Sequence, residues 1–195
     1  MFQYFIVYKP FQVLSQFSAV DHKKTLKDFF KVPSDVYPVG RLDYDSEGLL
    51  LLSNDPSLNH RLLNPAFKHE REYWVQVDGM ITNEALQLLG NGVHIKVDGK
   101  SFNTAKCKTS LFISKPEVPA RTPSIRFRKD IPAPWISLIL TEGKNRQVRK
   151  MTAAVGFPTL RLIRQRIENI TIENMQPGEM LALSKSLICK KLFHE

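Results

Sequence analysis

Two charged segments of this sequence carry residue types that could do chemistry. The first is Gly40-Arg41-Leu42-Asp43, in which a carboxylate follows a guanidinium by two positions in a predicted tight loop. A carboxylate beside a guanidinium stays ionised at neutral pH, which suits a nucleophile or a base better than a general acid. A purely structural ion pair between Arg41 and Asp43 is the competing interpretation.

The second segment is the run Thr141-Glu142-Gly143-Lys144-Asn145-Arg146-Gln147-Val148-Arg149-Lys150. We expect a helix over Asn145–Val155 with Asn145 as its N-cap, and with apolar side chains on one face. Cations in a first turn oppose the helix dipole, so we expect an anion opposite them: a carboxylate from elsewhere in the fold, a phosphate, or both. A tolerated surface cluster is the alternative. The cations concerned are Lys144, Arg146, Arg149 and Lys150.

A third segment, Arg71-Glu72-Tyr73-Trp74-Val75, places two aromatic residues side by side in a predicted strand. Alternation along a strand puts Tyr73 and Val75 on one face and Trp74 on the other. One ring is expected in the core, and the other could stack on an unpaired base, a contact worth ~1–3 kcal/mol. The residues by themselves favour burial of both rings.

The positive charge of the chain is concentrated in one stretch. The 28 Lys and Arg exceed the 19 Asp and Glu by nine, and residues 121–166 hold 11 bases against Asp130 and Glu142, which is also +9. Such a concentration predicts a surface that binds a polyanion. A basic face that serves only solubility is the alternative, and an anionic membrane is a weaker candidate.

Several other classes of protein find no support in the sequence. It contains no glycine-rich phosphate-binding motif and no histidine pair with metal-ligand spacing, and its two cysteines, Cys107 and Cys189, are too few for a disulfide framework. No apolar run approaches the ~20 residues that span a bilayer, and the N-terminus lacks the pattern of a secretory signal. We therefore expect a cytoplasmic protein without a membrane-spanning segment, and no motif indicates a metal site or a nucleotide cofactor.

The pattern of elements predicts an α+β fold with a mixed, mainly antiparallel sheet. Strands and helices mix without a regular βαβ alternation. We expect one domain over 1–195, made of two lobes with a cleft between them. The predicted strands are Phe2–Lys9, Leu49–Ser53, Tyr73–Val77, Phe102–Ile113 and Trp135–Thr141; the helices are Thr25–Val32, Pro56–Leu63, Thr82–Leu89 and Asn145–Val155; 115–134 is an irregular arm, and short strands end the chain.

Taken together, these segments resemble the pseudouridine synthases of the ribosomal small-subunit synthase A type. The resemblance rests on four segments in order along nearly the whole chain: Lys9-Pro10, Gly40 to Asp43 with Gly48 to Leu52, Arg71 to Val75, and Glu142 to Met151. Further details resemble members that act on large-subunit (23S) rRNA: Lys9 to Phe17, Tyr37 to Gly40, and Arg121 to Arg126 with Ile131-Pro132.

The resemblance implies an isomerase that converts one uridine of rRNA to pseudouridine without a cofactor. Asp43 matches the catalytic aspartate, Tyr73 the tyrosine that stacks on the target base, and Arg149 the basic residue that pairs with the aspartate. Arg41 would help to fill the gap left by the flipped nucleotide. Asp43 could attack the sugar or remove a ribose proton, and both roles fit these residues.

The sequence departs from the family pattern at Gln12, Arg71 and Lys144, where Gly, Lys and Arg are more usual.

Many relatives begin with a small S4-type RNA-binding module, whereas here the catalytic sequence starts within ten residues. We therefore expect the catalytic domain itself to recognise the target RNA. We also expect the protein to be a monomer. Another RNA site, or a non-catalytic role in ribosome assembly, stays open. The residues expected to contact RNA, besides those named above, are Arg121, Arg126, Arg128, Arg161 and Arg164.

Overall fold

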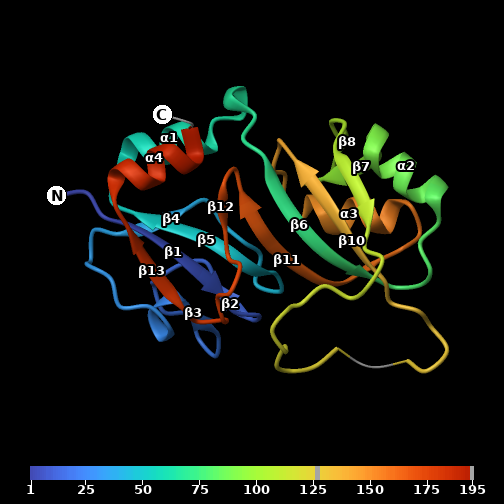
Figure 1. The fold of residues 1–195 in the computed structure, drawn as a ribbon, viewed down its shortest axis with the longest axis horizontal. Helices are drawn as coiled ribbons and strands as arrows, with labels where there is room; N and C mark the ends of the chain where they lie inside the picture. Colours follow the sequence, from blue (N-terminus) through green and yellow to red (C-terminus); the bar gives the residue numbers. More distant parts are fainter. Residues whose placement is uncertain (126–127, 194–195) are drawn as a thin grey trace. The chain divides into compact units, whose positions relative to one another are not determined.

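The computed structural model describes residues 1–125 and 128–193 and has the predicted α+β fold (Figure 1). The chain divides into two compact units. Unit 1 consists of Met1–His69 and Ile163–Glu195, and unit 2 consists of Glu70–Leu162. The expected single domain over 1–195 stays a prediction, and the two units are described in turn.

Unit 1 is built around strand β5 (Glu47–Ser53), whose seven residues are all buried. Strand β1 (Tyr4–Lys9) pairs antiparallel with one edge of β5 and, on its other side, with β13 (Met180–Leu183). The opposite edge of β5 is shared, because β4 (Tyr37–Val39) pairs with its end and β11 (Thr159–Ile167) pairs parallel with its start. The run of four leucines is therefore apolar on both faces, as a fully enclosed strand requires.

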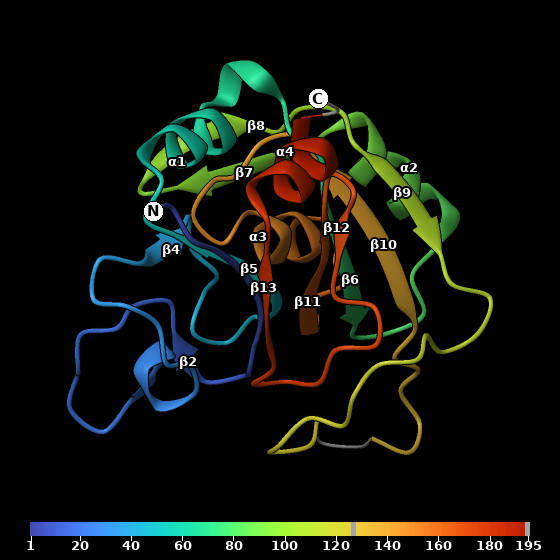
Figure 2. The same cartoon turned by 60° about the vertical axis from the view of Figure 1, so that its left-hand side comes forward.

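Helix α1 (Pro56–Leu63) follows β5 and packs on β4 and β5. Its first turn is stabilised by Asp55, whose carboxylate accepts hydrogen bonds from the amides of Ser57 (2.9 Å) and Leu58 (3.4 Å). Helix α4 (Lys185–Phe193) packs on the short strand β12 (Ile170–Thr171), as Figure 2 shows from a second direction.

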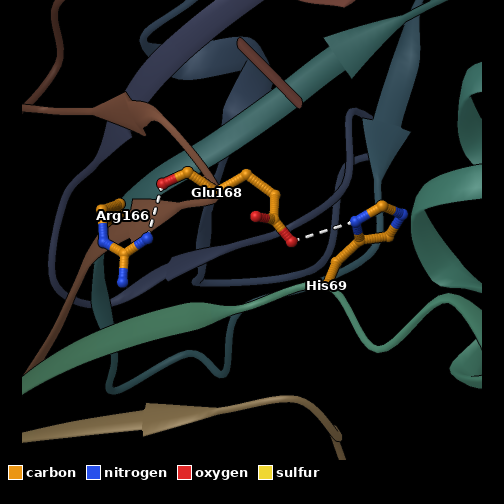
Figure 3. Close-up of polar contacts among 3 residues, drawn as sticks. All are labelled: His69, Arg166 and Glu168. Carbon is orange, nitrogen blue, oxygen red and sulfur yellow. Dashed lines mark hydrogen bonds and ion pairs between the residues drawn. The ribbon is translucent and has the colours of Figure 1, made fainter. Parts of the chain in front are cut away.

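The end of the first segment of unit 1, at His69, is held by a polar cluster of His69, Arg166 and Glu168 (Figure 3). His69 Nδ1 lies 3.1 Å from Glu168 Oε1, and Arg166 donates a hydrogen bond to the Glu168 carbonyl at 2.7 Å. The imidazole also contacts the rings of Phe67 and Phe193, with centroids 6.0 and 5.5 Å away. These contacts fix the end of the first segment of unit 1 to the loop after β11.

Unit 2 has an antiparallel sheet in the order β6 (Arg71–Val77), β10 (Trp135–Leu140) and β9 (Lys108–Leu111). Strands β7 (His94–Val97) and β8 (Lys100–Asn103) form a separate hairpin. Helices α2 (Asn83–Asn91) and α3 (Gln147–Ala154) contribute to the core formed by alternate residues of β6 and β10 (Figure 1). Residues 115–134, where they are described, contain no helix or strand, as predicted.

Two predicted elements differ in the structure, and one helix of the structure was not predicted. The helix expected over 25–32 is a single 3-10 turn, Leu26–Asp28, which ends where Phe29 leaves the helical conformation with φ −121° and ψ −34°. The strand expected over Phe102–Ile113 is two strands, β8 and β9, since the Thr104 and Ala105 backbone amides bond to the Val93 carbonyl and to Glu142. Helix α4 was not predicted, because its few buried residues leave a weak apolar periodicity.

None of the helices among the described residues is long and apolar enough to cross a membrane.

Candidate active site

Asp43 lies in a tight turn between β4 and β5 of unit 1, which we call the Asp43 turn (residues 40–47). Its backbone carbonyl accepts a hydrogen bond from the Ser46 amide at 3.1 Å, which closes a four-residue turn. Gly40 begins the turn with φ +76°, in the left-handed region, and a Cβ there would lie 3.0 Å from Leu63. The side chain of Asp43 is half-buried, and that of Arg41 is exposed.

The backbone next to Asp43 is fixed by a buried serine from a distant part of the chain. Ser15 Oγ donates to the Leu42 carbonyl at 2.8 Å and accepts from the Leu42 amide at 3.0 Å. Ser15 and Leu42 are both buried, so neither backbone group has water as a substitute partner. This pair of hydrogen bonds fixes the backbone of Leu42 and therefore the position from which the Asp43 side chain extends.

Beneath the turn lies Lys9, whose side chain is fully buried. Its ammonium donates hydrogen bonds to the carbonyls of Pro10 (2.9 Å) and Val13 (2.7 Å). Burial lowers the pKa of Lys9 to about 7, against the attraction of Glu47, Asp43 and Asp45, which raises it. Lys9 in its protonated form, which is half-populated near pH 7, is therefore an internal counter-charge for the three carboxylates of the Asp43 turn.

The start of β5 is held against β11 by a close backbone approach. Gly48 has φ +109°, and a Cβ there would lie 2.3 Å from the carbonyl oxygen of Arg164, so only glycine fits. Arg164 Nε in turn donates to the Leu49 carbonyl at 2.8 Å. Arg164 was expected to contact RNA, but its side chain is only 5% exposed. It holds in place the strand that follows Asp43.

Tyr73 lies on β6 of unit 2, opposite Leu138 of β10. Its ring is partly buried against the core of that unit. Trp74, on the other face of the strand, makes an edge contact with Phe112 at 5.2 Å between centroids, and its indole N–H donates to Glu72 at 2.9 Å. Both aromatic rings therefore have protein neighbours, but each is only partly buried, whereas the residues by themselves favoured burial of both.

Arg149 lies on α3, which starts two residues later than predicted. The expected N-cap, Asn145, was wrong: Arg146 occupies that position with φ 53° and no side-chain cap. The first turn is closed instead by Gln147, whose side-chain oxygen accepts from the Lys144 amide at 2.9 Å, while Asn145 bonds to Asp98. The first turn of α3 contains no acid of its own, and the carboxylate at this end is that of Glu142, which accepts a hydrogen bond from the Gln147 side chain at 2.5 Å.

The other predicted RNA-contacting residues of unit 2 differ in accessibility. Lys144, Arg146 and Arg128 are exposed, Lys150 and Arg121 are partly so, and Arg128 forms an ion pair with Asp78. Arg161 is 6% exposed and donates to the Pro119 carbonyl at 2.9 Å, so it anchors the arm. Because Arg161 and Arg164 are buried, we leave them out of the proposed RNA surface. Arg126 lies outside the described residues.

Unit 1 thus brings Asp43 together with Lys9, Ser15 and Arg164. In unit 2, Tyr73 packs on the same core as the buried face of the helix that carries Arg149. Sequence patterns predicted no role for Ser15, and Lys9 entered only as part of the family resemblance. No periodicity or spacing signals that a lysine is enclosed or that a serine bonds to a backbone 27 residues away. Among the described residues, no acidic, histidine and cysteine groups cluster as a metal site.

Comparisons with known proteins identify the family of the chain. Residues 3–154 match the family described as RNA pseudouridylate synthase. The chain is 47% identical over 171 residues to ribosomal large subunit pseudouridine synthase E of Vibrio parahaemolyticus, which covers 88% of this chain and 69% of the relative. The chain belongs to the RNA pseudouridylate synthase family.

Two further matches support the membership. The protein of the same name from Xanthomonas axonopodis pv. citri is 46% identical over 176 residues, which covers 89% of this chain and 90% of the relative. A crystal structure of a pseudouridylate synthase superposes with a TM-score of 0.77 at 27% identity, covering 98% of this chain and 74% of the other. The resemblance, the fold class and the enzyme class, an isomerase, are therefore confirmed for this pseudouridylate synthase.

Proposed function

We propose that this pseudouridylate synthase isomerises one uridine of large-subunit (23S) rRNA. The observation that supports the substrate class is the sequence identity of 45–47% to four relatives that are all named ribosomal large subunit pseudouridine synthase E. The excess of positive charge in residues 121–166 supports an RNA partner. Monomeric action in the cytoplasm, without a metal or cofactor, is part of the proposal.

In the proposed reaction, the target base is first extruded from its stack, which costs a few kcal/mol. The bond between the base nitrogen and the ribose breaks, and the base rejoins the ribose through a ring carbon. The proton of that carbon leaves and a ring nitrogen gains one, so the product has the composition of the substrate. The balance of atoms therefore calls for no second substrate.

Asp43 is the proposed catalytic carboxylate, acting on the sugar or on a ribose proton. Its turn is fixed by Ser15 on one side and by the Gly48–Arg164 contact on the other, so the carboxylate can be presented with little motion. We propose that Tyr73 stacks on the extruded base and that Arg149 pairs with Asp43 in the enzyme–RNA complex. Arg41, which is exposed, would occupy the space that the base leaves.

Replacement of Asp43 tests the catalytic proposal. We expect D43N to bind 23S rRNA with the affinity of the wild type and to form no pseudouridine, measured by chromatography of the digested nucleosides. D45N is the matched control, because it removes the same charge from the same turn and should retain activity. Pseudouridine formation by D43N at the wild-type rate would remove Asp43 from its role.

A further inference from the structure

A second group of cations lies in unit 1, outside the stretch that holds the net charge of the chain. Unit 1 has 13 Lys and Arg against 11 Asp and Glu, a net charge of only +2. Within it, residues 23–31 hold four lysines and one acid, Asp28. That carboxylate accepts hydrogen bonds from the Thr25 amide (2.7 Å) and hydroxyl (3.1 Å). The charge of unit 1 is therefore polarised toward this segment.

This segment is fixed beside the Asp43 turn by two independent connections. Strand β3 (Lys24–Thr25) pairs parallel with β2 (Val13–Leu14), and the residue after β2 is Ser15, which bonds to Leu42. In addition, Lys23 Nζ lies 5.4 Å from the ring centroid of Tyr44, the residue next to Asp43. The lysines are thus held close to the proposed catalytic carboxylate within one unit.

The cations in this segment are combined with accessible aromatic rings. Lys24 Nζ lies 5.8 Å from the ring centroid of Phe29, which is 36% exposed, and Tyr44 is half-buried. Lys23 and Lys24 are both exposed, and neither forms an ion pair with a carboxylate among the described residues. Exposed cations interleaved with aromatic rings are typical of surfaces that bind single-stranded nucleic acid.

Lys23 and Lys24 lie next to a turn with an excess of negative charge, which affects how RNA can approach it. The turn carries three carboxylates, Asp43, Asp45 and Glu47, against one exposed cation, Arg41, so its net charge repels RNA phosphates. The internal counter-charge, Lys9, is fully buried and cannot contact RNA. Cations on the surface next to the turn would offset the remaining repulsion where the substrate must approach.

We propose that Lys23 and Lys24, with the rings of Tyr44 and Phe29, form an RNA-contacting surface that binds the backbone flanking the target uridine. This inference rests on the proposed function, and it adds a binding surface on unit 1 to the cations of residues 121–166. Each lysine contacts one phosphate, and the aromatic rings stack on unpaired bases.

The salt dependence of RNA binding tests this surface. The probe is a fluorescent 20-nucleotide oligouridylate, whose Kd is measured between 50 and 300 mM KCl. The association constant K for single-stranded RNA falls as the salt concentration rises. Removal of two phosphate contacts makes the negative slope of log K against log salt less steep by about 1.4, and it weakens binding ~20-fold at 0.1 M salt. We expect this result for the double variant K23A/K24A. The matched control is K185A/K190A, which removes two exposed lysines from α4 of the same unit.

The outcomes separate the surface from the function. An unchanged slope for K23A/K24A, or an equal change in both double variants, would overturn the RNA surface. Circular dichroism establishes that both variants are folded. Pseudouridine formation in 23S rRNA is measured on the same wild-type preparation, and its absence would overturn the proposed function whatever the slopes are. An active wild type with an unchanged K23A/K24A slope would refute the surface alone.

Discussion

The buried Lys9 makes the stability of this protein depend on pH in a predictable direction. Its pKa is about 7 in the folded protein, against an ordinary value of 10.5 in the unfolded chain. Between these two values the unfolded state binds more protons than the folded state. The free energy of unfolding therefore rises with pH from about 7 to about 10.5, and below pH 7 the folded protein bears the full cost of the buried charge.

The size of the effect follows from the proton count. Each pH unit over which the two states differ by one proton changes the free energy of unfolding by about 1.4 kcal/mol. Between pH 7 and pH 9, the protonated fraction of Lys9 falls from one half to near zero in the folded state, while Lys9 of the unfolded state stays protonated. The expected gain in stability is about 2 kcal/mol.

Urea unfolding at pH 7 and pH 9 measures this gain, with the variant K9M as reference. Groups that titrate in both proteins, such as Cys107, whose pKa burial raises to about 11, cancel in the difference. The stability of the wild type minus that of K9M should rise by about 2 kcal/mol over this interval. A 13C NMR titration of the Lys9 side chain gives an independent midpoint, expected near pH 7. A constant difference in stability together with an NMR midpoint near 10.5 would refute the reasoning.

Three further substitutions test the elements around the Asp43 turn. G48A places a methyl group against the Arg164 carbonyl and should lower the urea-derived free energy of unfolding by at least about 3 kcal/mol; wild-type stability would contradict this. D55A removes the N-cap of α1 and should lower the free energy of unfolding by about 1–2 kcal/mol at pH 7. Burial raises the pKa of Asp55, but its hydrogen bonds outweigh this effect and lower the pKa, so the loss of stability should shrink as the pH falls below ~4. S15A leaves both Leu42 backbone groups unpaired, which costs ~1–3 kcal/mol. Its kcat on 23S rRNA should fall while the RNA Kd stays unchanged, and an unchanged kcat per folded molecule would argue against a positioning role.

Local sequence signals predicted the elements that depend on local physics. The four leucines of β5 read as a buried strand, and Thr82 and Pro56 mark the starts of α2 and α1, since apolar runs and helix starts are encoded by neighbouring residues. The turn that holds Asp43 was expected for the same reason, because Gly and Pro bound it.

The features that the sequence could not give depend on contacts between distant segments. The burial of Lys9 and Arg164 is decided by β1, β5 and β11 coming together, and the same residue types on a surface would have the same sequence pattern. The start of α3 was misplaced because Asn145 bonds to Asp98, far along the chain, instead of capping its own helix. Basic residues identified by charge alone therefore divide into those that face solvent and those that hold strands together.

The central claim, that this pseudouridylate synthase modifies large-subunit rRNA through Asp43, is tested most directly by a map of pseudouridines. Total rRNA is compared from cells that lack the protein and from the same cells complemented with wild type or with D43N. The account predicts that one 23S pseudouridine is missing in the deletion, returns with the wild type and stays missing with D43N. An identical 23S map in all three strains would contradict the account.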